Sequence, residues 1–324
     1  YPRTVKDKVE KSEPDGWKDG YDYRIAPCDV KLYRVLLSNC KIEVKEKVSI
    51  KDNSRNKILS LRDISGIRNT LLLLPTFNQH FEGINVEAEY ILGRDADELK
   101  KESLYLGMHG LDITVDFTSM LNFYPKLTLL DNLPERYRES YQTIESIFEK
   151  MSIIGSRKAI FSLHRMPENR FTVEETVESF RRNMEEIADL AQRYEITIYI
   201  ESNPWKISAL IGIGNVCDLI KELNRSNVKL VLNTCHCLGE GEDLVGLYDE
   251  YREHIGMVKI SAPYMDHFGQ YYDHHLPVKG SQFEDDIRSL IRHIKEEDAD
   301  IILCCDAVYS GWDELWTDLR LVEG

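Results

Sequence analysis

The chain has 324 residues, of which 42% are apolar, and its 17 tyrosines and 10 phenylalanines are enough for one large hydrophobic core. Lysine and arginine total 41 against 56 aspartate and glutamate residues, which gives a net charge of −15. This acidic balance excludes strong non-specific binding to nucleic acid, because such binding depends on clustered cations. A small basic patch around a site is still compatible with it.

No apolar stretch reaches the roughly 18 residues that a membrane-spanning helix needs, and the first residues show no signal-peptide pattern. Seven cysteines, an odd number without the spacing of a disulfide framework, indicate a reducing compartment. We therefore expect a soluble, intracellular protein with no membrane partner. Residues 1–22 are mostly charged, so we predict a charged extension there and a single domain over residues 23–324.

Short apolar runs recur along the rest of the chain. Such runs, with few alternating polar residues, are typical of parallel strands that are buried on both faces. In chain order, the predicted strands are 32–37, 70–74, 104–108, 158–163, 196–200, 228–232, 257–260 and 301–305. Residues 38–68 fit this scheme least well, because their Lys/Glu-rich part, 41–51, is compatible with either a hairpin insertion or an irregular first helix.

Amphipathic segments separate these runs. Over residues 134–151, Tyr137, Tyr141 and Ile144 begin an apolar face with helical spacing, and Pro134 suits a first helical position. Similar patterns predict further helices at 174–194, 215–223 and 283–296. Eight strands that alternate with helices predict a (β/α)8 barrel, the TIM barrel fold.

Polar side chains collect where the predicted strands end. In a parallel barrel the carboxyl ends of the strands meet at one rim, and catalytic groups gather there. The candidate residues at this rim are His109, His164, Glu201, Asn233, His236, Lys259, Asp273, His274, His275, Cys304 and Asp306. Histidine, aspartate and glutamate are ordinary zinc ligands. One such histidine is usually structural, but their recurrence at one rim predicts a metal site.

Two segments resemble a known family. Leu232-Asn233-Thr234-Cys235-His236 is similar to the Leu-Asp-Thr-Cys-His segment of the endonuclease IV family of apurinic/apyrimidinic endonucleases, within the xylose isomerase-like barrel superfamily. Asp273-His274-His275, followed by Gly280, resembles that family's Asp-Arg-His segment before a glycine. Three further residues match the family singly, by their order in the chain. His109 and His164 correspond to the family's third- and fourth-strand histidines, and Glu201 corresponds to its metal-bridging glutamate.

The resemblance implies a trinuclear zinc site that cuts a DNA backbone beside an abasic residue, with a metal-bound hydroxide as nucleophile. One implied metal is held by His109, His164 and the bridging Glu201. Another is held by His236, Asp273 and His275, which leaves a position open for water or phosphate. At the remaining metal this chain departs from the family: the expected aspartate is Asn233, the expected histidine is Lys259, and the bridging glutamate falls at Cys304 or Asp306.

These replacements predict one or two Zn²⁺ or Mn²⁺ ions where the family holds three. A neutral amide is a weak ligand, and a protonated amine cannot bind a metal. Lys259 can instead supply the missing positive charge to Glu201 and to a substrate oxygen. We expect a catalytic role for Glu201, Lys259 and Asn233. The expected metal ligands are His109, His164, Glu201, His236, Asp273, His275 and Asp306.

Two other patterns, one of cysteines and one of aromatic residues, allow further interpretations. Cys235-x-Cys237 with Cys304-Cys305 could form a thiolate site, but adjacent residues of a strand point to opposite faces, which disfavours it. The aromatic residues Tyr264, Phe268, Tyr271 and Tyr272 could stack on a base or sugar, although packing within their loop is the simpler interpretation.

Three functions stay open at this point. The first is a divergent metal-dependent phosphodiesterase, acting on a phosphodiester or sugar phosphate, with damaged DNA as one candidate substrate. The second is a metal-dependent sugar isomerase or epimerase, which needs acids at positions 233 and 306 and a histidine near 259. The third is a barrel kept as a binding or structural module after loss of catalysis. The complete set of His236, Asp273 and His275 favours the first.

Overall fold

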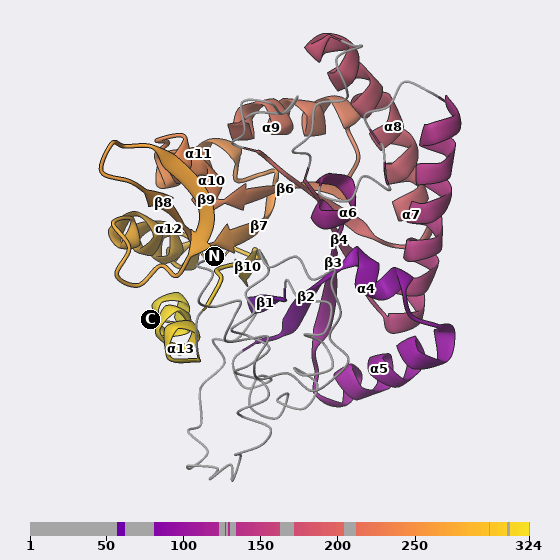
Figure 1. Cartoon of the computed structure of the whole chain (residues 1–324), viewed down its shortest axis with the longest axis horizontal. Helices are drawn as coiled ribbons and strands as arrows, with labels where there is room; N and C mark the ends of the chain where they lie inside the picture. Colours follow the sequence, from indigo (N-terminus) through magenta and orange to yellow (C-terminus); the bar gives the residue numbers. More distant parts are fainter. Residues whose placement is uncertain are drawn as a thin grey trace, which may run out of the picture.

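The computed structural model describes residues 57–61, 81–122, 127, 129, 134–162, 172–203, 212–297, 299–309 and 312–323. Its centre is a closed barrel of parallel strands in the order β1-β10-β7-β6-β5-β4-β3-β2, with helices around the outside (Figure 1). The strands are β1 (Lys57–Leu61), β2 (Gly83–Glu87), β3 (Asp112–Asp116), β4 (Lys158–Ser162), β5 (Thr197–Glu201), β6 (Val228–Asn233), β7 (Ile255–Ile260) and β10 (Ile302–Cys305). The predicted TIM barrel is confirmed.

Helices follow most of these strands. They are α4 (Ala88–Leu92), α5 (Ala96–Met108), α6 (Thr118–Asn122), α7 (Pro134–Ile154), α8 (Val173–Arg193), α9 (Gly212–Leu223), α10 (Thr234–Gly239), α11 (Leu244–Tyr251), α12 (Glu284–Glu296) and α13 (Trp312–Glu323). The predictions for 134–151, 174–194, 215–223 and 283–296 are confirmed within a few residues at each end. In the part of the chain that the structure describes, no helix is long and apolar enough to cross a membrane.

The start of α8 shows why the helical predictions succeeded. The Thr172 side chain accepts a hydrogen bond from the Glu175 backbone N–H, and the Glu175 carboxylate accepts one from the Thr172 backbone N–H in return. This capping box satisfies donors that the first turn cannot pair internally. Further along, Phe180, Met184 and Ile187 recur with helical spacing and are completely buried. Cap and apolar face therefore specify the same helix.

The predicted strand at 104–108 is wrong, because these residues end the helix α5. Asp95 and Glu98 form a capping box at the start of this helix, and Leu104 and Met108 are 69% and 74% exposed. A five-residue apolar run does not distinguish a strand from part of a helix, whereas the cap upstream does. The strand in this part of the chain is β3, which ends at Asp116.

Other predictions concern the N-terminal part of the chain. The predicted strands at 32–37 and 70–74, the Lys/Glu-rich stretch 41–51 and the proposed extension 1–22 lie outside the described residues. The first barrel strand is β1, which falls within the stretch 38–68 that fitted the pattern poorly, and β2 follows at Gly83–Glu87.

The barrel interior determines where the functional groups lie. Six buried side chains form a cluster inside the barrel: Ile160, Tyr199, Val231, Met257, Ile302 and Cys304. Successive side chains of a strand point to opposite faces, so residues two positions further along share this inward direction. On β5, β6 and β7 those residues are Glu201, Asn233 and Lys259. A polar layer thus lies directly above an apolar one, at the carboxyl ends of the strands.

An antiparallel hairpin follows β7 and stands beside α10 (Figure 1). It consists of β8 (Ala262–Met265) and β9 (Tyr271–Leu276). A Cβ at Gly239, the last residue of α10, would overlap the Tyr271 ring, so this position requires glycine. The close contact holds β9, and with it Asp273 and His275, against α10.

Candidate functional site

Lys259 lies at the centre of the polar layer and is 2% exposed. Its Nζ is 2.8 Å from Oε2 of Glu201 and 3.1 Å from Oδ2 of Asp116, which ends β3. Burial raises the pKa of Asp116, but the Lys259 ammonium and the hydrogen bonds from Thr118 outweigh it and hold this pKa below its usual value. The ammonium therefore acts as the shared cation of two buried carboxylates and offsets part of their charge.

Asn233 completes the surroundings of Glu201. Its Nδ2 donates to Oε1 of Glu201, the oxygen that Lys259 does not contact. Its Oδ1 accepts from the backbone N–H of Cys235 at 2.9 Å, which caps the start of α10. An aspartate here could cap the helix equally well, but it could not donate to Glu201. The amide at position 233 and the ammonium at position 259 thus form one hydrogen-bonded unit with Glu201.

A second cluster lies next to this unit and contains His236, Asp273 and His275. The Nε2 atom of His236 is 3.5 Å from Oδ2 of Asp273, and the Nε2 atom of His275 is 3.0 Å from Oδ1. Burial raises the pKa of Asp273, but the two histidines outweigh it and hold this pKa well below its usual value. Two imidazoles and one carboxylate with nitrogen and oxygen atoms directed at one another are a donor set that zinc prefers.

Each histidine of this cluster has its second ring nitrogen fixed by a neighbour. The Nδ1 atom of His236 donates to the backbone carbonyl of Ser202 at 2.8 Å, since a carbonyl can only accept. The Nδ1 atom of His275 is 3.2 Å from Oδ2 of Asp306 and 3.0 Å from Oγ of Ser261. Such partners at Nδ1 orient the two rings with Nε2 toward Asp273, as in carboxylate–histidine–zinc arrangements, and the Nε2 atom of His236 also lies 3.5 Å from Nδ2 of Asn233.

The backbone at His275 supports a functional interpretation. Its φ angle is +47°, a left-handed conformation that side chains with a Cβ rarely adopt. Strained residues of this kind persist where surrounding contacts hold them, and they concentrate at functional sites. Here the strain turns the His275 ring inward, between Asp273 and Asp306.

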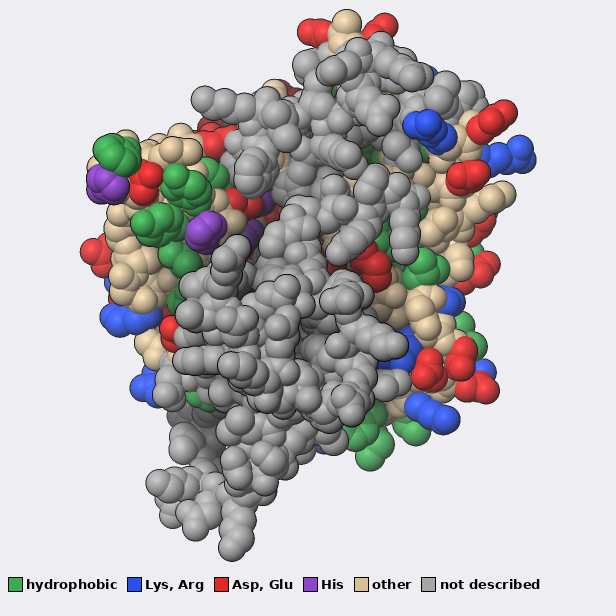
Figure 2. Space-filling view, viewed as in Figure 1, with side chains coloured by type: hydrophobic (Ala, Val, Ile, Leu, Met, Phe, Trp, Pro, Cys, Tyr) green, Lys and Arg blue, Asp and Glu red, His purple; other side chains and the backbone are tan. Residues whose placement is uncertain are grey.

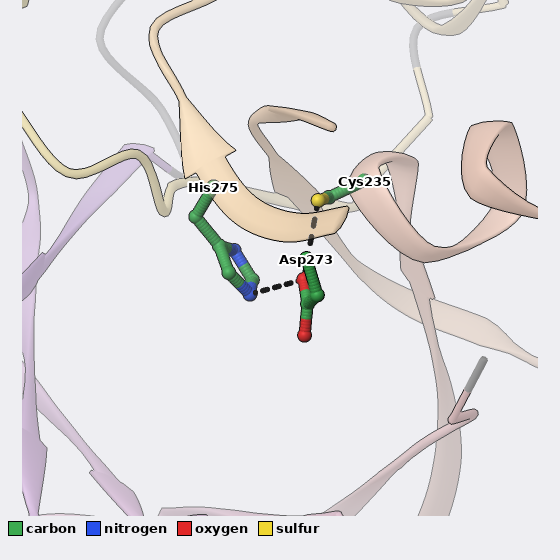
Figure 3. A group of neighbouring side chains, drawn as sticks. All are labelled: Cys235, Asp273 and His275. Carbon is green, nitrogen blue, oxygen red and sulfur yellow. Dashed lines mark hydrogen bonds and ion pairs between the residues drawn. The ribbon is translucent and has the colours of Figure 1, made fainter. Parts of the chain in front are cut away.

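Cys235 adds a sulfur to the same cluster. Its Sγ is 3.3 Å from Oδ1 of Asp273, the same oxygen that pairs with the His275 ring (Figure 3). Cys235, Asp273 and His275 each offer one ligand atom within 4.8 Å of the others. Burial, and then the Asp273 carboxylate, raise the pKa of this thiol well above its usual value. The predicted thiolate group of Cys235, Cys237, Cys304 and Cys305 is a different combination, and the structure groups Cys235 with Asp273 and His275 instead.

The structure separates His109 from the other predicted ligands. His109 follows the last residue of α5 and precedes β3, so it lies at the amino end of the strands, opposite to the rim that carries Glu201. The prediction of His109 as a rim residue was therefore wrong, and its cause is the helix mistaken for a strand at 104–108. His164 lies outside the described residues, so the metal position implied for His109, His164 and Glu201 is left without a described histidine.

The remaining predicted residues divide between two roles. Asp306 follows β10 and contacts His275, so it orients this ring, and the alternative residue Cys304 lies in the apolar barrel interior.

Asp116 was missed, although the alternation of Asp112, Thr114 and Asp116 with apolar residues could have indicated its strand. The predicted aromatic loop is the hairpin β8–β9, where Tyr264, His267, Phe268 and His274 are exposed and gather on one side of the molecule (Figure 2).

Comparisons with known proteins agree with the barrel fold. The sequence model of a family described as "Xylose isomerase-like TIM barrel" matches residues 81–319. No curated protein has a sequence that matches the chain.

Similar solved structures share the fold at low sequence identity. The 3-keto-D-glucoside 4-epimerase YcjR from E. coli is 12% identical over 83% of this chain and 97% of its own, with a TM-score of 0.62. An IolI protein with a bound zinc atom is 15% identical over 83% and 95%, with a TM-score of 0.62. A family 2 AP endonuclease from Brucella melitensis is 16% identical over 81% and 96%, also with a TM-score of 0.62.

Proposed function

Because the chain belongs to the xylose isomerase-like TIM barrel family, we propose that it is a metal-dependent hydrolase of the phosphodiesterase type. In this proposal, one Zn²⁺ or Mn²⁺ ion is held by His236, Asp273 and His275. The observation that carries the proposal is the assembled cluster of these three residues beside a cation position already filled by Lys259. The number of ions is thus one, and a phosphodiester is the substrate class.

The chain's own residues would prepare this site in two ways. Ser202 and Asp306 orient the two imidazoles, so that both Nε2 atoms face Asp273. Lys259 would supply a fixed positive charge where the endonuclease IV-like arrangement has a further metal. Glu201, which also accepts from Asn233, holds the ammonium in place. A bound ion would supply a Lewis acid and an activated water for attack on phosphorus.

The same arrangement argues against a metal at the position that an isomerase uses. That ion needs acids at positions 233 and 306 and a histidine near 259. Here Asn233 donates to Glu201, Lys259 contacts Glu201 and Asp116, and Asp306 contacts His275. The ammonium of Lys259 thus fills the place of the ion.

One observation favours a second candidate, a sugar isomerase or epimerase that uses the ion held by His236, Asp273 and His275. The two clusters contain four carboxylates among the described residues: Asp116, Glu201, Asp273 and Asp306. Lys259 is the basic side chain that the described residues place in contact with them. One divalent ion would leave the described part of the site with a net negative charge, which suits a neutral polyhydroxylated substrate better than an anion. An epimerase among the similar structures supports this candidate.

A substrate comparison on zinc- and manganese-loaded protein tests both. We expect hydrolysis of bis(p-nitrophenyl) phosphate, and nicking of a duplex with an abasic site, that His275→Ala abolishes. His293→Ala is the matched control, because His293 lies on α12 and pairs with the exposed Asp249. Epimerisation of ketohexoses without phosphodiester cleavage would reject the hydrolase in favour of the second candidate. Loaded protein that is inactive on all these substrates would reject both enzymes and leave a binding module.

A further inference from the structure

Cys235 has an environment that a packing role does not explain. Its neighbour Cys237, two residues along α10, belongs to the hydrophobic core, whereas the Cys235 sulfur contacts Asp273 and lies 3.9 Å from the Tyr271 hydroxyl. The backbone N–H of His275 also donates to this sulfur. A completely buried sulfur surrounded by a carboxylate, a hydroxyl and an amide N–H is placed as a polar participant in the site.

The distances around Asp273 match a coordination shell. Ligand bonds to zinc of about 2.0 Å for nitrogen or oxygen and 2.3 Å for sulfur give donor-to-donor edges of roughly 3.3 to 3.7 Å in a tetrahedron. From Oδ1 of Asp273, the separations are 3.3 Å to Cys235 Sγ and 3.0 Å to His275 Nε2, so both lie within a few tenths of an ångström of such an edge. The ligand atoms of these three residues all lie within 4.8 Å of one another. His236 approaches the other oxygen, with its Nε2 atom 3.5 Å from Oδ2.

We propose that Cys235 is a ligand of the metal ion, which makes the site a sulfur, carboxylate and two-imidazole centre. The inference rests on the proposed metal cluster of His236, Asp273 and His275 and deepens it. On binding, the thiol proton is released to solvent, and the sulfur forms the bond to the ion. Four protein donors fill the tetrahedral shell of zinc, so a water or phosphate oxygen would have to enter as a fifth ligand, an expansion that occurs at some catalytic zinc sites.

A thiolate ligand determines which metal the site selects. Soft sulfur donors favour Zn²⁺ over Mg²⁺ and Mn²⁺, which prefer oxygen ligands. Of the two ions considered for the proposed function, the structure thus assigns zinc. Removing an outer-shell partner alone costs about 10- to 100-fold in metal affinity, so loss of the sulfur should weaken zinc binding by at least about 10-fold, and manganese binding much less.

Cobalt substitution of the full-length protein tests this assignment without reference to activity. The Co²⁺-loaded wild type should show visible d–d bands and a sulfur-to-cobalt charge-transfer band in the near ultraviolet. Cys235→Ser should lose the charge-transfer band and keep the d–d bands, whereas Cys237→Ser, the matched control, should keep both. Circular dichroism of each variant reports whether it is folded.

The outcomes separate this inference from the proposed function. Wild-type d–d bands without a charge-transfer band would show a metal site that lacks sulfur, which overturns the role of Cys235 and leaves the hydrolase proposal standing. A charge-transfer band that persists in Cys235→Ser would overturn it as well. Absence of any cobalt band in folded wild type would overturn both. The wild-type spectrum decides the matter even where a variant does not fold.

Discussion

Replacing Lys259 with methionine removes the ammonium that contacts both Glu201 and Asp116 but keeps a side chain of similar length. Both carboxylates are buried, with exposed fractions of 4% and 7%. Removing one partner of a buried ion pair leaves an uncompensated charge and costs about 3 to 5 kcal/mol. Because Lys259 is only 2% exposed, we expect a loss of free energy of unfolding in that range at neutral pH.

The pH dependence of this loss follows from Asp116. In the wild type its pKa lies below the usual value, so Asp116 contributes stability that is present above the unfolded pKa of about 3.9 and is lost as pH falls through the folded pKa. In the variant the ammonium no longer offsets the effect of burial, so the pKa of Asp116 rises. The carboxyl of the variant then takes up a proton at milder pH, so the difference between variant and wild type should narrow as pH falls toward 4.

Urea unfolding at neutral pH and at mildly acidic pH, followed by circular dichroism, measures this effect. Lys100→Met is the matched control: Lys100 pairs with Asp97 on the surface, where both side chains are mostly exposed. Such a pair contributes about 1 kcal/mol or less. A Lys259→Met variant that is as stable as the Lys100→Met control at neutral pH would refute the account of Lys259 as the central cation.

Three further predictions concern the two clusters. Lys259→Met should keep its bound zinc and lose hydrolytic activity, with zinc content and turnover measured on the same folded sample. Unchanged turnover would reject the proposal that the Lys259 ammonium replaces the charge of a second metal ion. Asp306→Asn should weaken zinc binding by about 10- to 100-fold, because it loosens the orientation of the His275 ring, and zinc titration with a chelator would show it. Gly239→Ala should cost about 1 to 3 kcal/mol through overlap with Tyr271; unaltered thermal unfolding would contradict the close contact.

The sequence was sufficient for the fold class and for one of the two clusters, although β1, β2 and β3 lie at other residues than the predicted strands. Amphipathic helices and strands buried on both faces leave clear patterns, and the residues of α7, α8 and α12 follow them closely. His236 lies just after β6, so the prediction needed only the end of that strand. Asp273 and His275 were identified from their resemblance to an Asp-x-His segment, although they lie on the hairpin β8–β9 and not at the end of a barrel strand.

The rest of the site depended on geometry that the sequence does not carry. His109 was predicted at the carboxyl end of the third strand, where the structure has Asp116, because the apolar run at the end of α5 has the composition of a strand. The role of Cys235 depends on how the hairpin folds back onto α10, a contact between residues nearly 40 positions apart. Asp306 was expected to bind metal, which stays a prediction, and its contact with Nδ1 of His275 could not be read from the sequence.

The central claim is that this barrel holds one metal ion, at the cluster of His236, Asp273 and His275, because Lys259 replaces another. Elemental mass spectrometry of protein purified without chelators or a metal affinity column tests it most directly. We expect one zinc ion per wild-type chain and none in folded His275→Ala. A metal-free wild type, or a count of two or three ions per chain, would contradict it.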